Sequence, residues 1–398
     1  MIGAGTEQVP VIDVAHELDV EVIAVDGDPR APGFAAADAC YPLDLGDVAA
    51  IVDRARAHRC RFILPAPLGA FLVTVGAVND ALGFRGLSER AARNCTDKER
   101  AHRCLREACL PVADSASVSE TTTSAVAAAA ERLGYPVVVK PSRGSGSRGV
   151  FVARDRRELD AWLPHHLEER ARLPAPQHTL VERHIAGREL GVDGAMIGAE
   201  LHLVLVRDKE LTPLPHRLGH GYLAPADIDG PTAAALEDAL ARAARAVGLR
   251  DCLLHADVIV DGSGGPHVIE LAGRPSGFHI ASRMIPAAID VSPMREMIAH
   301  LLGDRPALAP RCRRGSVLRM LHAEAGTLRA VSGIEEAAAM PGVVACETYL
   351  GRGDVIHPPV DGRTGFRCGY LLTAGADRAE AEDRWQAAAS RIRWEMET

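Results

Sequence analysis

Three lysines carry the first chemical signal in this sequence. Lys98, Lys140 and Lys209 are the only lysines among 398 residues, although lysine and arginine together number 45. Arginine serves generic surface charge well, but a planar guanidinium does not replace a compact ammonium group where one point charge must fit against a phosphate. The three lysines are therefore candidates for binding an anionic ligand.

A loop rich in glycine and serine follows directly after Lys140. It runs from Ser142 to Gly149 and separates two apolar segments, residues 137–140 and 151–152. Glycine lets a chain come close to an anion, and backbone N–H groups and hydroxyls can surround phosphate oxygens. The pattern G-x-x-x-x-G-K-[ST] is absent, and a strand follows instead of a helix, so this is not a P-loop. We expect a mobile loop that binds phosphate.

Two carboxylates lie on successive predicted strands, residues 254–260 and 267–271. Pairing of these strands through the glycine-rich turn between them would bring Asp257 and Glu270 to one end of a sheet. A few carboxylates, together with substrate phosphates, are the ligands that Mg²⁺ prefers. Arg274 follows shortly after and could hold a carboxylate or a transferring phosphoryl group. The segment predicts a metal site beside a cationic side chain.

The first residues invite a second interpretation. The pattern Gly3-x-Gly5-x-x-Gln8, with Asp26 at the end of the next strand, is similar to a dinucleotide-binding turn. Gln8 stands where the third glycine would let helix and strand pack closely. A nicotinamide-binding dehydrogenase is therefore disfavoured.

The elements that must position these residues alternate at first between strand and helix. The opening residues, a helix over about 10–18, a strand over 22–25, a helix over 48–57 and a strand over 62–64 predict a parallel sheet. From about residue 96 the pattern becomes α+β. Helices are expected over 97–108, 124–133 and 232–247, and strands over 137–140, 151–152, 179–182, 190–195 and 201–206. Thr122 or Thr123 and Gly248 are the expected helix caps.

The composition argues against several classes of protein. A formal charge of -8 and an aromatic content of 4% give no basic field for a nucleic-acid backbone, so nucleic acid is not an expected partner. No apolar stretch approaches the roughly 18 residues that would span a bilayer, and we expect a cytoplasmic protein without a membrane segment. The nine cysteines form no C-x-x-C pair, which favours reduced thiols over a zinc site.

In order along the chain, these pieces resemble the ATP-grasp superfamily, in particular its carboxylate-amine ligases related to biotin carboxylase and to L-amino acid ligases. Thr96-Asp97-Lys98 is similar to the segment of the family's first ATP lysine, and Tyr135-Pro136-Val137-Val138-Val139-Lys140-Pro141 to that of its second. The stretch from Gly3 to Asp38 resembles the domain that precedes the ATP-grasp domain, and the residues from Gly315 onward resemble the C-terminal domain of biotin carboxylase-like ligases.

The resemblance implies three domains in an α/β and α+β architecture. Residues 1–95 would form the pre-ATP-grasp domain with a parallel sheet. Residues 96–310 would form the ATP-grasp domain, with a mobile lid subdomain over about 113–187. Residues 311–398 would form a small C-terminal domain. A homodimer is a family-based expectation.

The resemblance also assigns roles to residues. Glu182, Arg183 and Ile185 would meet adenine at the hinge, and Glu189 would bind the ribose. Asp257 and Glu270 would hold Mg²⁺ or Mn²⁺, and Arg274 with Lys140 would be catalytic. Arg274, Ser276 and Gly277 would contact the substrate. The residues expected to bind ATP are Lys98, Lys140, Ser142, Gly144, Ser145, Gly146, Ser147, Gly149, Glu182, Arg183, Ile185 and Glu189.

One departure from the family concerns the metal. The family usually carries Glu-x-Asn on the second metal strand, whereas this chain has Glu270-Leu271-Ala272. Alanine cannot coordinate, so a second magnesium site would be weaker, with water in the gap, or catalysis would be impaired.

The expected function is an ATP-dependent carboxylate-amine ligase that forms an amide or peptide bond through an acyl-phosphate and releases ADP and phosphate. Its partners would be a small-molecule carboxylate and an amine. A bicarbonate-using carboxylating or carbamoylating ATPase of nucleotide metabolism is the second interpretation. The third is a nucleotide-binding regulatory protein that has lost turnover, as Ala272 would allow.

Overall fold

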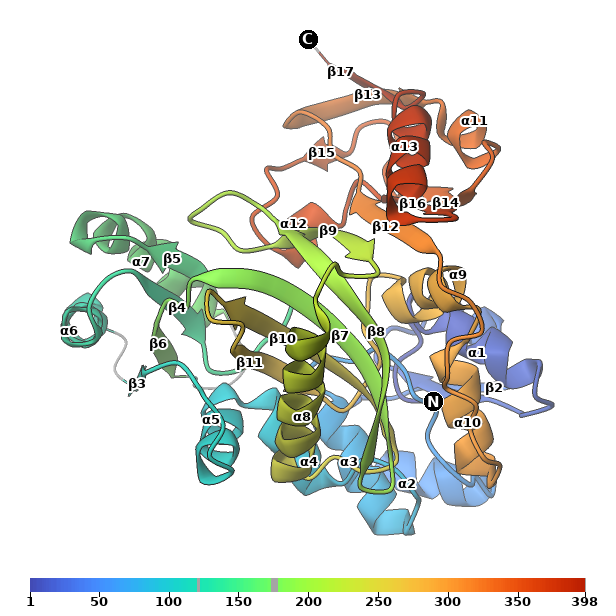
Figure 1. Ribbon diagram of the computed structural model, residues 1–398. Helices are drawn as coiled ribbons and strands as arrows, with labels where there is room; N and C mark the ends of the chain where they lie inside the picture. The colour runs from blue at the N-terminus through green and yellow to red at the C-terminus, as the bar shows by residue number, and fades with distance from the viewer. Residues whose placement is uncertain (120–121, 173–177, 398) are drawn as a thin grey trace.

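The computed structural model describes residues 1–119, 122–172 and 178–397 (Figure 1). Its N-terminal unit holds a short parallel pair, β1 (Ile23–Asp26) and β2 (Ala39–Pro42), which Ile2 extends by a parallel bridge to Val25. The helices of this unit are α1 (Val9–His16), α2 (Val48–Ala57), α3 (Leu72–Leu82) and α4 (Glu89–Thr96), with a 3₁₀ turn at Pro32–Ala35. The expected βαβ beginning is present.

One expected strand of this unit does not form. Residues 62–64 pair with no strand, although Leu64 is buried. Pro65 and Pro67 follow directly, and proline lacks the N–H that a strand ladder needs. The segment is apolar because it packs in the core and not because it belongs to a sheet. The strand prediction for 62–64 is therefore wrong.

A four-stranded antiparallel sheet, the lid sheet, follows after α5 (Lys98–Glu107). Its strand order is β3 (Ser115–Val118), β6 (Thr179–Arg183), β4 (Val137–Pro141) and β5 (Phe151–Ala153). Two helices, α6 (Thr123–Leu133) and α7 (Arg156–Ala171), pack with it around a small apolar core of their own. Thr122 caps α6 by accepting from the N–H of Ala125, as expected.

An eight-stranded antiparallel sheet, the central sheet, forms the middle of the molecule. Its strand order is β11 (Pro266–Ala272), β10 (Cys252–Asp261), β7 (Gly187–Ile197), β8 (Glu200–Leu211), β9 (Gly219–Ala224), β12 (Gly315–Met320), β16 (Tyr370–Gly375) and β14 (Val343–Glu347). Helix α8 (Gly230–Val247) packs beside β8 and β11 and ends at Gly248, whose φ of 89° suits glycine.

The C-terminal region contributes to this same sheet. Strands β12, β14 and β16 come after residue 310 and continue the central sheet through the β9–β12 pairing. A separate three-stranded sheet consists of β13 (Gly326–Ser332), β15 (Val355–Ile356) and β17 (Arg393–Met396). The helices here are α11 (Ile334–Ala338), α12 (Gly362–Gly365) and α13 (Arg378–Ala389).

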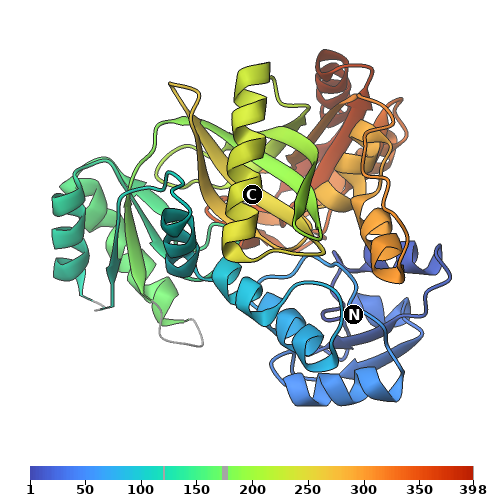
Figure 2. The same cartoon turned by 60° about the horizontal axis from the view of Figure 1, so that its bottom comes forward.

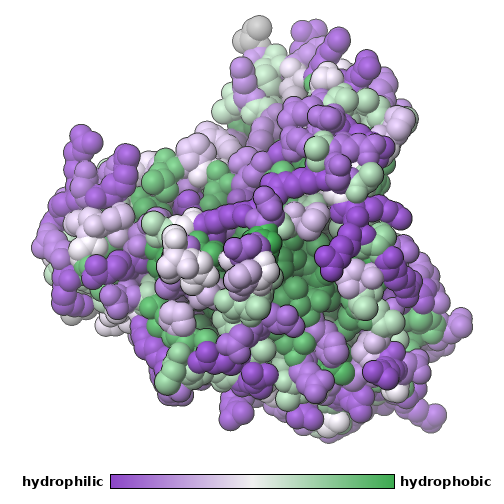
Figure 3. Space-filling model, viewed as in Figure 1, coloured by the Kyte–Doolittle hydropathy of each residue, from purple (hydrophilic) through white to green (hydrophobic). Residues whose placement is uncertain are grey.

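Between the two parts of the central sheet the chain forms a π-helical turn (Ile280–Met284), α9 (Ile285–Ile289) and α10 (Pro293–Leu302). Figure 2 shows the lid sheet standing to one side, with the N-terminal unit below and the C-terminal region above the opposite side. In Figure 3 polar side chains cover the outer parts of the molecule, and apolar ones gather near its middle. Among the helices that the structure describes, none is both long and apolar enough to cross a membrane.

Candidate functional site

All three lysines of the chain line one pocket, here called the lysine pocket. Lys140 belongs to β4 of the lid sheet, Lys209 to β8 of the central sheet, and Lys98 to the first turn of α5. The pocket therefore lies between the two sheets. Its other lining residues come from the glycine loop (142–149), the segment after β6 and strands β7, β10 and β11.

The lid side of the pocket holds a buried ion pair. Lys140 Nζ lies 2.7 Å from Glu182 Oε2, and both side chains are about 5% exposed. His102 Nε2 lies 3.4 Å from the other oxygen, Oε1. Burial lowers the pKa of His102 by more than the Glu182 carboxylate raises it, so the imidazole is neutral at pH 7. Oε1 has no hydrogen-bond partner within the described residues. Glu182 therefore offers a buried acceptor at the pocket's edge.

Hydrogen bonds and an ion pair join the start of the glycine loop to the start of α5. Asp97 caps this helix through Oδ1, which accepts from the N–H of Glu99 and Arg100, and its Oδ2 accepts from Arg143 at 3.0 and 3.1 Å. Lys98 donates its backbone N–H to Ser142 O and its ammonium group to Gly144 O. The lysine and the loop are thus positioned by one local network.

The loop itself turns through several left-handed residues. Gly144, Gly146, Ser147 and Gly149 all have positive φ, between 55° and 136°. Such a path exposes backbone groups to the space beside it. Gly144, Ser145 and Ser147 line the lysine pocket, together with Arg143 and Arg148. The turn thus presents its middle to the pocket.

The other predicted loop residues lie elsewhere. Ser142 is buried beneath the loop, where its N–H donates to His178 O. Gly149 O contacts His166 Nδ1 at 2.7 Å, away from the pocket. Gly146 faces a neighbouring cavity, described below, and its carbonyl accepts from Gly362 N in α12. These three residues therefore support the loop and do not line the lysine pocket.

The central-sheet side of the pocket holds the two predicted metal ligands. Asp257 of β10 and Glu270 of β11 are direct cross-strand partners, next to a β-bulge after Asp257. The predicted hairpin is therefore confirmed, and it places both carboxylates at the same edge of the pocket. Neither residue is more than partly exposed. Paired carboxylates of this kind fit a hard divalent cation.

Lys209 lies between two carboxylates on this side. Its Nζ is 2.6 Å from Glu189 Oε1 and 2.9 Å from Asp257 Oδ2. Glu189 Oε2 also accepts from Arg217 at 3.0 Å. Burial lowers the pKa of Lys209, but the carboxylates of Asp257 and Glu189 raise it by more, so it lies above its ordinary value. Burial raises the pKa of Asp257, but Lys209, His255 and Arg207 together lower it by more, so it lies below its ordinary value. Both groups are charged at pH 7.

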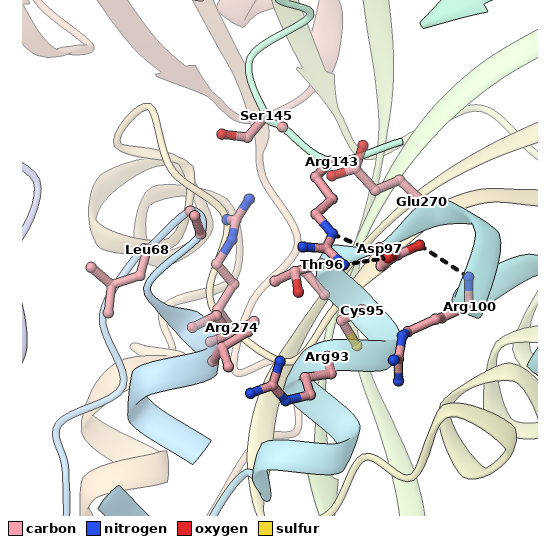
Figure 4. A pocket seen from close by; sticks show the side chains of 16 residues that line it. Leu68, Arg93, Cys95, Thr96, Asp97, Arg100, Arg143, Ser145, Glu270 and Arg274 are labelled. Carbon is pink, nitrogen blue, oxygen red and sulfur yellow. Dashed lines mark hydrogen bonds and ion pairs between the residues drawn. The ribbon is translucent and has the colours of Figure 1, made fainter. Parts of the chain in front are cut away.

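A second hollow beside the lysine pocket, the arginine pocket, is drawn in Figure 4. Arg274 lines it, and in the figure its side chain extends toward Ser145 of the glycine loop. Glu270 and Arg143 line both pockets. The two spaces therefore meet at the second metal-ligand candidate, and Arg274 stands beside that meeting point.

A third space, the side cavity, has a volume of about 290 Å³. Arg274, Ser276 and Gly277, the three predicted substrate residues, all line it, and so do Lys209 and Asp257. Ser276 Oγ is buried and has no hydrogen-bond partner within the described residues. The side cavity therefore adjoins the lysine pocket at the Lys209–Asp257 ion pair.

Glu7 of the N-terminal unit also lines the side cavity. One carboxylate oxygen accepts from the N–H of His279, and the other would lie only 2.6 Å from a β-carbon at position 277. Phe278 and His279 both have positive φ, 55° and 56°. Two such non-glycine residues in a row cost conformational energy, and strain of this kind gathers at functional sites.

The structure brings most of the predicted residues together. Lys98, Lys140, Gly144, Ser145, Ser147, Glu182, Arg183, Ile185, Glu189, Asp257 and Glu270 line the lysine pocket, and Arg274, Ser276, Gly277 and Gly146 line the side cavity. The sequence prediction omitted Arg217, His184 and Glu7, and it named Lys209 as a candidate anion-binding lysine without assigning it a role. Only Lys209 had a signal, its rarity as a lysine; Glu7 is some 270 residues from the turn that it supports.

Two family models match the chain. Residues 133–282 match the ATP-grasp domain, and residues 319–397 match the L-amino acid ligase C-terminal domain 2. Among curated proteins, the protein y4rH of Sinorhizobium fredii is 29% identical over 335 residues, which cover 82% of this chain and 66% of y4rH. The formate-dependent phosphoribosylglycinamide formyltransferase of a Sulfurovum species is 28% identical over 40% of this chain and 41% of its own length.

The chain therefore spans less than two thirds of the length of these relatives. A solved structure covers it fully: the L-amino acid ligase of Bacillus licheniformis superimposes with a TM-score of 0.84 at 21% identity, over 100% of this chain and 98% of the ligase. The predicted fold, an ATP-grasp architecture with an N-terminal parallel sheet and a C-terminal domain, is confirmed. This chain therefore carries an ATP-grasp domain, matched over residues 133–282, and an L-amino acid ligase C-terminal domain 2, matched over residues 319–397.

Proposed function

We propose that this protein is an ATP-dependent ligase that activates a small-molecule carboxylate as an acyl-phosphate and joins it to an amine. The observation that carries the proposal is the convergence of all three lysines on one pocket. That pocket has paired carboxylates at one end and adjoins a cavity lined by an arginine. The arrangement suits positioning and charge neutralisation during phosphoryl transfer.

The lid side of the lysine pocket fits the adenosine part of ATP. The unpartnered Oε1 of Glu182 would accept a hydrogen bond from the exocyclic amine of adenine, and Arg183 and Ile185 line the same edge. Glu189 would accept from the ribose hydroxyls. Its two oxygens each have one protein donor, and a carboxylate has about four lone-pair sites, so capacity remains.

The phosphates would lie against Lys98, Lys140 and the middle of the glycine loop. Lys140 has three ammonium hydrogens, and its one ion-pair partner among the described residues is Glu182, so donors remain for phosphate oxygens. Gly144, Ser145 and Ser147 would add backbone and hydroxyl donors. Ser142, Gly146 and Gly149 would keep the loop in shape. Closure of this loop would exclude water from a reactive acyl-phosphate.

The paired carboxylates fit a bound Mg²⁺ or Mn²⁺. Asp257 and Glu270 would hold the ion, which would neutralise charge on the transferring phosphoryl group. Arg274 would stabilise the same group from the side of the arginine pocket. The proposed roles of Asp257 and Glu270 follow from their shared edge of the lysine pocket, and that of Arg274 from its place in the arginine pocket.

The side cavity would bind the substrate. Its volume, about 290 Å³, lies at the lower limit of ordinary ligand sites and suits a molecule of amino-acid size. Arg274 would pair with the substrate carboxylate. Glu7, on the N-terminal side of the side cavity, would bind an ammonium group. An amino acid carries both groups, so we propose amino acids as the substrate class.

In the proposed reaction the carboxylate oxygen takes the γ-phosphoryl group of ATP, and ADP is released. The amine then attacks the acyl carbon, and phosphate leaves with one oxygen of the original carboxylate. The protein's contribution is to hold the reacting groups in line and to surround the developing charge with Lys98, Lys140 and Arg274. A homodimer remains part of this proposal on the basis of the family resemblance.

The test is ADP release by the purified chain with ATP, Mg²⁺ and pairs of amino acids. We expect release that depends on the amino acids, and its loss in the Lys140→Ala variant but not in Arg30→Ala, an exposed site far along the chain from the pocket. Turnover that survives Lys140→Ala would contradict the assignment. Turnover with bicarbonate alone would favour a carboxylating ATPase, and tight ATP binding without turnover a regulatory protein.

A further inference from the structure

Ala272 stands where the family that this chain resembles usually carries an asparagine that binds a metal ion. We propose that the enzyme works with a single divalent cation, and that the ammonium group of Lys209 takes the place of a second one. This inference rests on the proposed function, because it concerns the phosphate end of the same pocket.

Ala272 leaves one oxygen donor fewer beside the metal edge, which is the edge of the lysine pocket that carries Asp257 and Glu270. It lies two residues after Glu270 on β11, so both side chains point to the same face of the strand, and both line the arginine pocket. The methyl group is 7% exposed and has no atom that could bind a cation. Any second ion beside Glu270 would therefore lack the protein ligand that a family-typical asparagine provides.

Lys209 fills the opposite side of the metal edge with positive charge. Its ammonium group bridges Glu189 Oε1 and Asp257 Oδ2, and the side chain is 8% exposed. To reach Asp257, it must cross strand β7. The Lys209 side chain can pass over β7 because Gly191, which lies opposite both Asp257 of β10 and Arg207 of β8, has no side chain.

A residue larger than glycine does not fit at position 191. A β-carbon at Gly191 would lie 2.3 Å from Nη1 of Arg207, which pairs with Asp193 at 2.7 Å. The charged layer of Asp193, Arg207, Lys209 and Asp257 is thus tightly packed. A fixed ammonium group is a compact point charge, and here its position is set by two carboxylates and by the packing around it.

The carboxylates that remain are enough for one ion only. Glu189 is already paired with two cations, Lys209 and Arg217, and Asp193 with Arg207. Asp257 Oδ1, 3.7 Å from His255 Nε2, and Glu270 are left for a metal ion. Within the described residues no group of three or more potential ligands surrounds a common point. Two carboxylate oxygens together with phosphate oxygens and water complete the shell of one Mg²⁺. The ammonium group of Lys209 lies at the Asp257 end of this edge, opposite Ala272, and supplies one positive charge that a second ion would otherwise bring.

The experiment counts bound metal without turnover. Mn²⁺ is titrated into the full chain loaded with one equivalent of the non-hydrolysable ATP analogue AMP-PNP, and free Mn²⁺ is measured by electron paramagnetic resonance. We expect the wild-type complex to saturate at one Mn²⁺. In Lys209→Met, Asp257 loses its lysine and Glu189 keeps Arg217 alone, and we expect a second Mn²⁺ to bind.

Two further variants separate the causes. Arg217→Met removes a cation from Glu189 but leaves Lys209 in place, and we expect it to retain one Mn²⁺. Ala272→Asn restores the missing donor, and we expect one Mn²⁺ alone but two together with Lys209→Met. If Lys209→Met does not fold, the wild-type and Ala272→Asn titrations still decide, because two ions in the wild type or in Ala272→Asn alone would overturn the inference.

The outcomes also separate this inference from the proposed function. If the chain binds neither AMP-PNP nor its Mn²⁺ complex, both the proposed function and the inference fail. If the wild type binds AMP-PNP with two Mn²⁺, the proposed function stands and only the role of Lys209 is wrong. An unchanged stoichiometry of one in a folded Lys209→Met variant would likewise overturn it.

Discussion

The lid sheet and the central sheet each bring one buried lysine to the same pocket, and the two lysines are held differently. Lys140 has one carboxylate partner, Glu182, whereas Lys209 has two, Glu189 and Asp257. An ammonium group has three donors. Lys140 therefore has more hydrogen-bonding capacity left for a ligand, while Lys209 is committed to the protein. The comparison suggests that one lysine binds phosphate and the other sets the charge of the metal edge.

The largest expected effect concerns stability. Removing one partner of a buried ion pair typically costs about 3–5 kcal/mol, because the remaining charge is left unpaired. Lys209→Met removes two ion-pair contacts, one to Asp257 and one to Glu189, which keeps Arg217, and Lys140→Met removes one, to Glu182. We therefore expect losses near about 5 and about 3 kcal/mol. Chemical denaturation of the two variants without ligand checks the order. A smaller loss for Lys209→Met would show that the central-sheet lysine is not held more firmly.

The second prediction reverses this order for nucleotide affinity. Loss of a charged contact to phosphate of about 3 kcal/mol corresponds to roughly 100-fold in Kd. We expect Lys140→Met to weaken ATP binding by about that factor, and Lys209→Met by less than about tenfold. Calorimetric titration with ATP in the absence of metal measures both. Equal weakening would remove the distinction between the two lysines.

The third prediction is that the stability of the lid sheet depends on pH more than that of the central sheet does. His166 belongs to the lid side, its Nδ1 contacts Gly149 O, and burial lowers its pKa to about 4. The unfolded chain, with a histidine pKa near about 6.5, then binds more protons than the folded one between these values. Stability is full above pH 6.5 and falls as the pH drops toward 4, by about 2 kcal/mol at pH 5 for this group.

Hydrogen exchange resolved along the chain measures this effect. We expect β4, β5 and α7 to lose protection at pH 5 before β7, β8 and β10 do. In a His166→Gln variant, which keeps a donor and removes the titrating ring, the pH-dependent part of the difference should shrink. A lid whose protection is independent of pH between 7 and 5 would contradict this account of His166.

The smallest expected effect lies where the lid touches the C-terminal region. Glu169 of α7 pairs with Arg363 of α12 at 2.7 Å, but the arginine side chain is 60% exposed. Exposed ion pairs contribute about 0–1 kcal/mol. We expect Arg363→Ala to change ATP affinity by less than about fivefold, since the backbone bond from Gly362 N to Gly146 O remains. A larger change, measured by the same titration, would make α12 part of the nucleotide site.

Local signals predicted much of the fold. The boundaries of α2, the cap at Thr122, the stop at Gly248 and the hairpin of β10 and β11 all depend on residues close in sequence, and the structure has each of them. The pairing of β9 with β12 could not be predicted in this way, because it joins residues almost a hundred positions apart. Nor did the sequence reveal that residues 62–64 pack without pairing.

In the candidate site, too, contacts between residues close in sequence were predictable and contacts between distant residues were not. Lys140 and the glycine loop are neighbours in sequence, so their association was predictable. Lys209 meets Asp257 only because β7 lies between their strands and carries Gly191 at the crossing point. Glu7 reaches its turn from the other end of the chain. Rarity could mark Lys209 as a candidate, but only the sheet order shows which charges it joins.

The most direct test of the central claim follows the oxygen atoms. The purified chain is incubated with ATP, Mg²⁺ and a mixture of amino acids labelled with ¹⁸O in both carboxylate oxygens, and the released phosphate and any dipeptide are analysed by mass spectrometry. Transfer through an acyl-phosphate predicts one ¹⁸O in each phosphate formed with dipeptide, and none in the Lys140→Ala control, which should release no phosphate. Dipeptide formed together with unlabelled phosphate, or phosphate released without any dipeptide, would contradict the account.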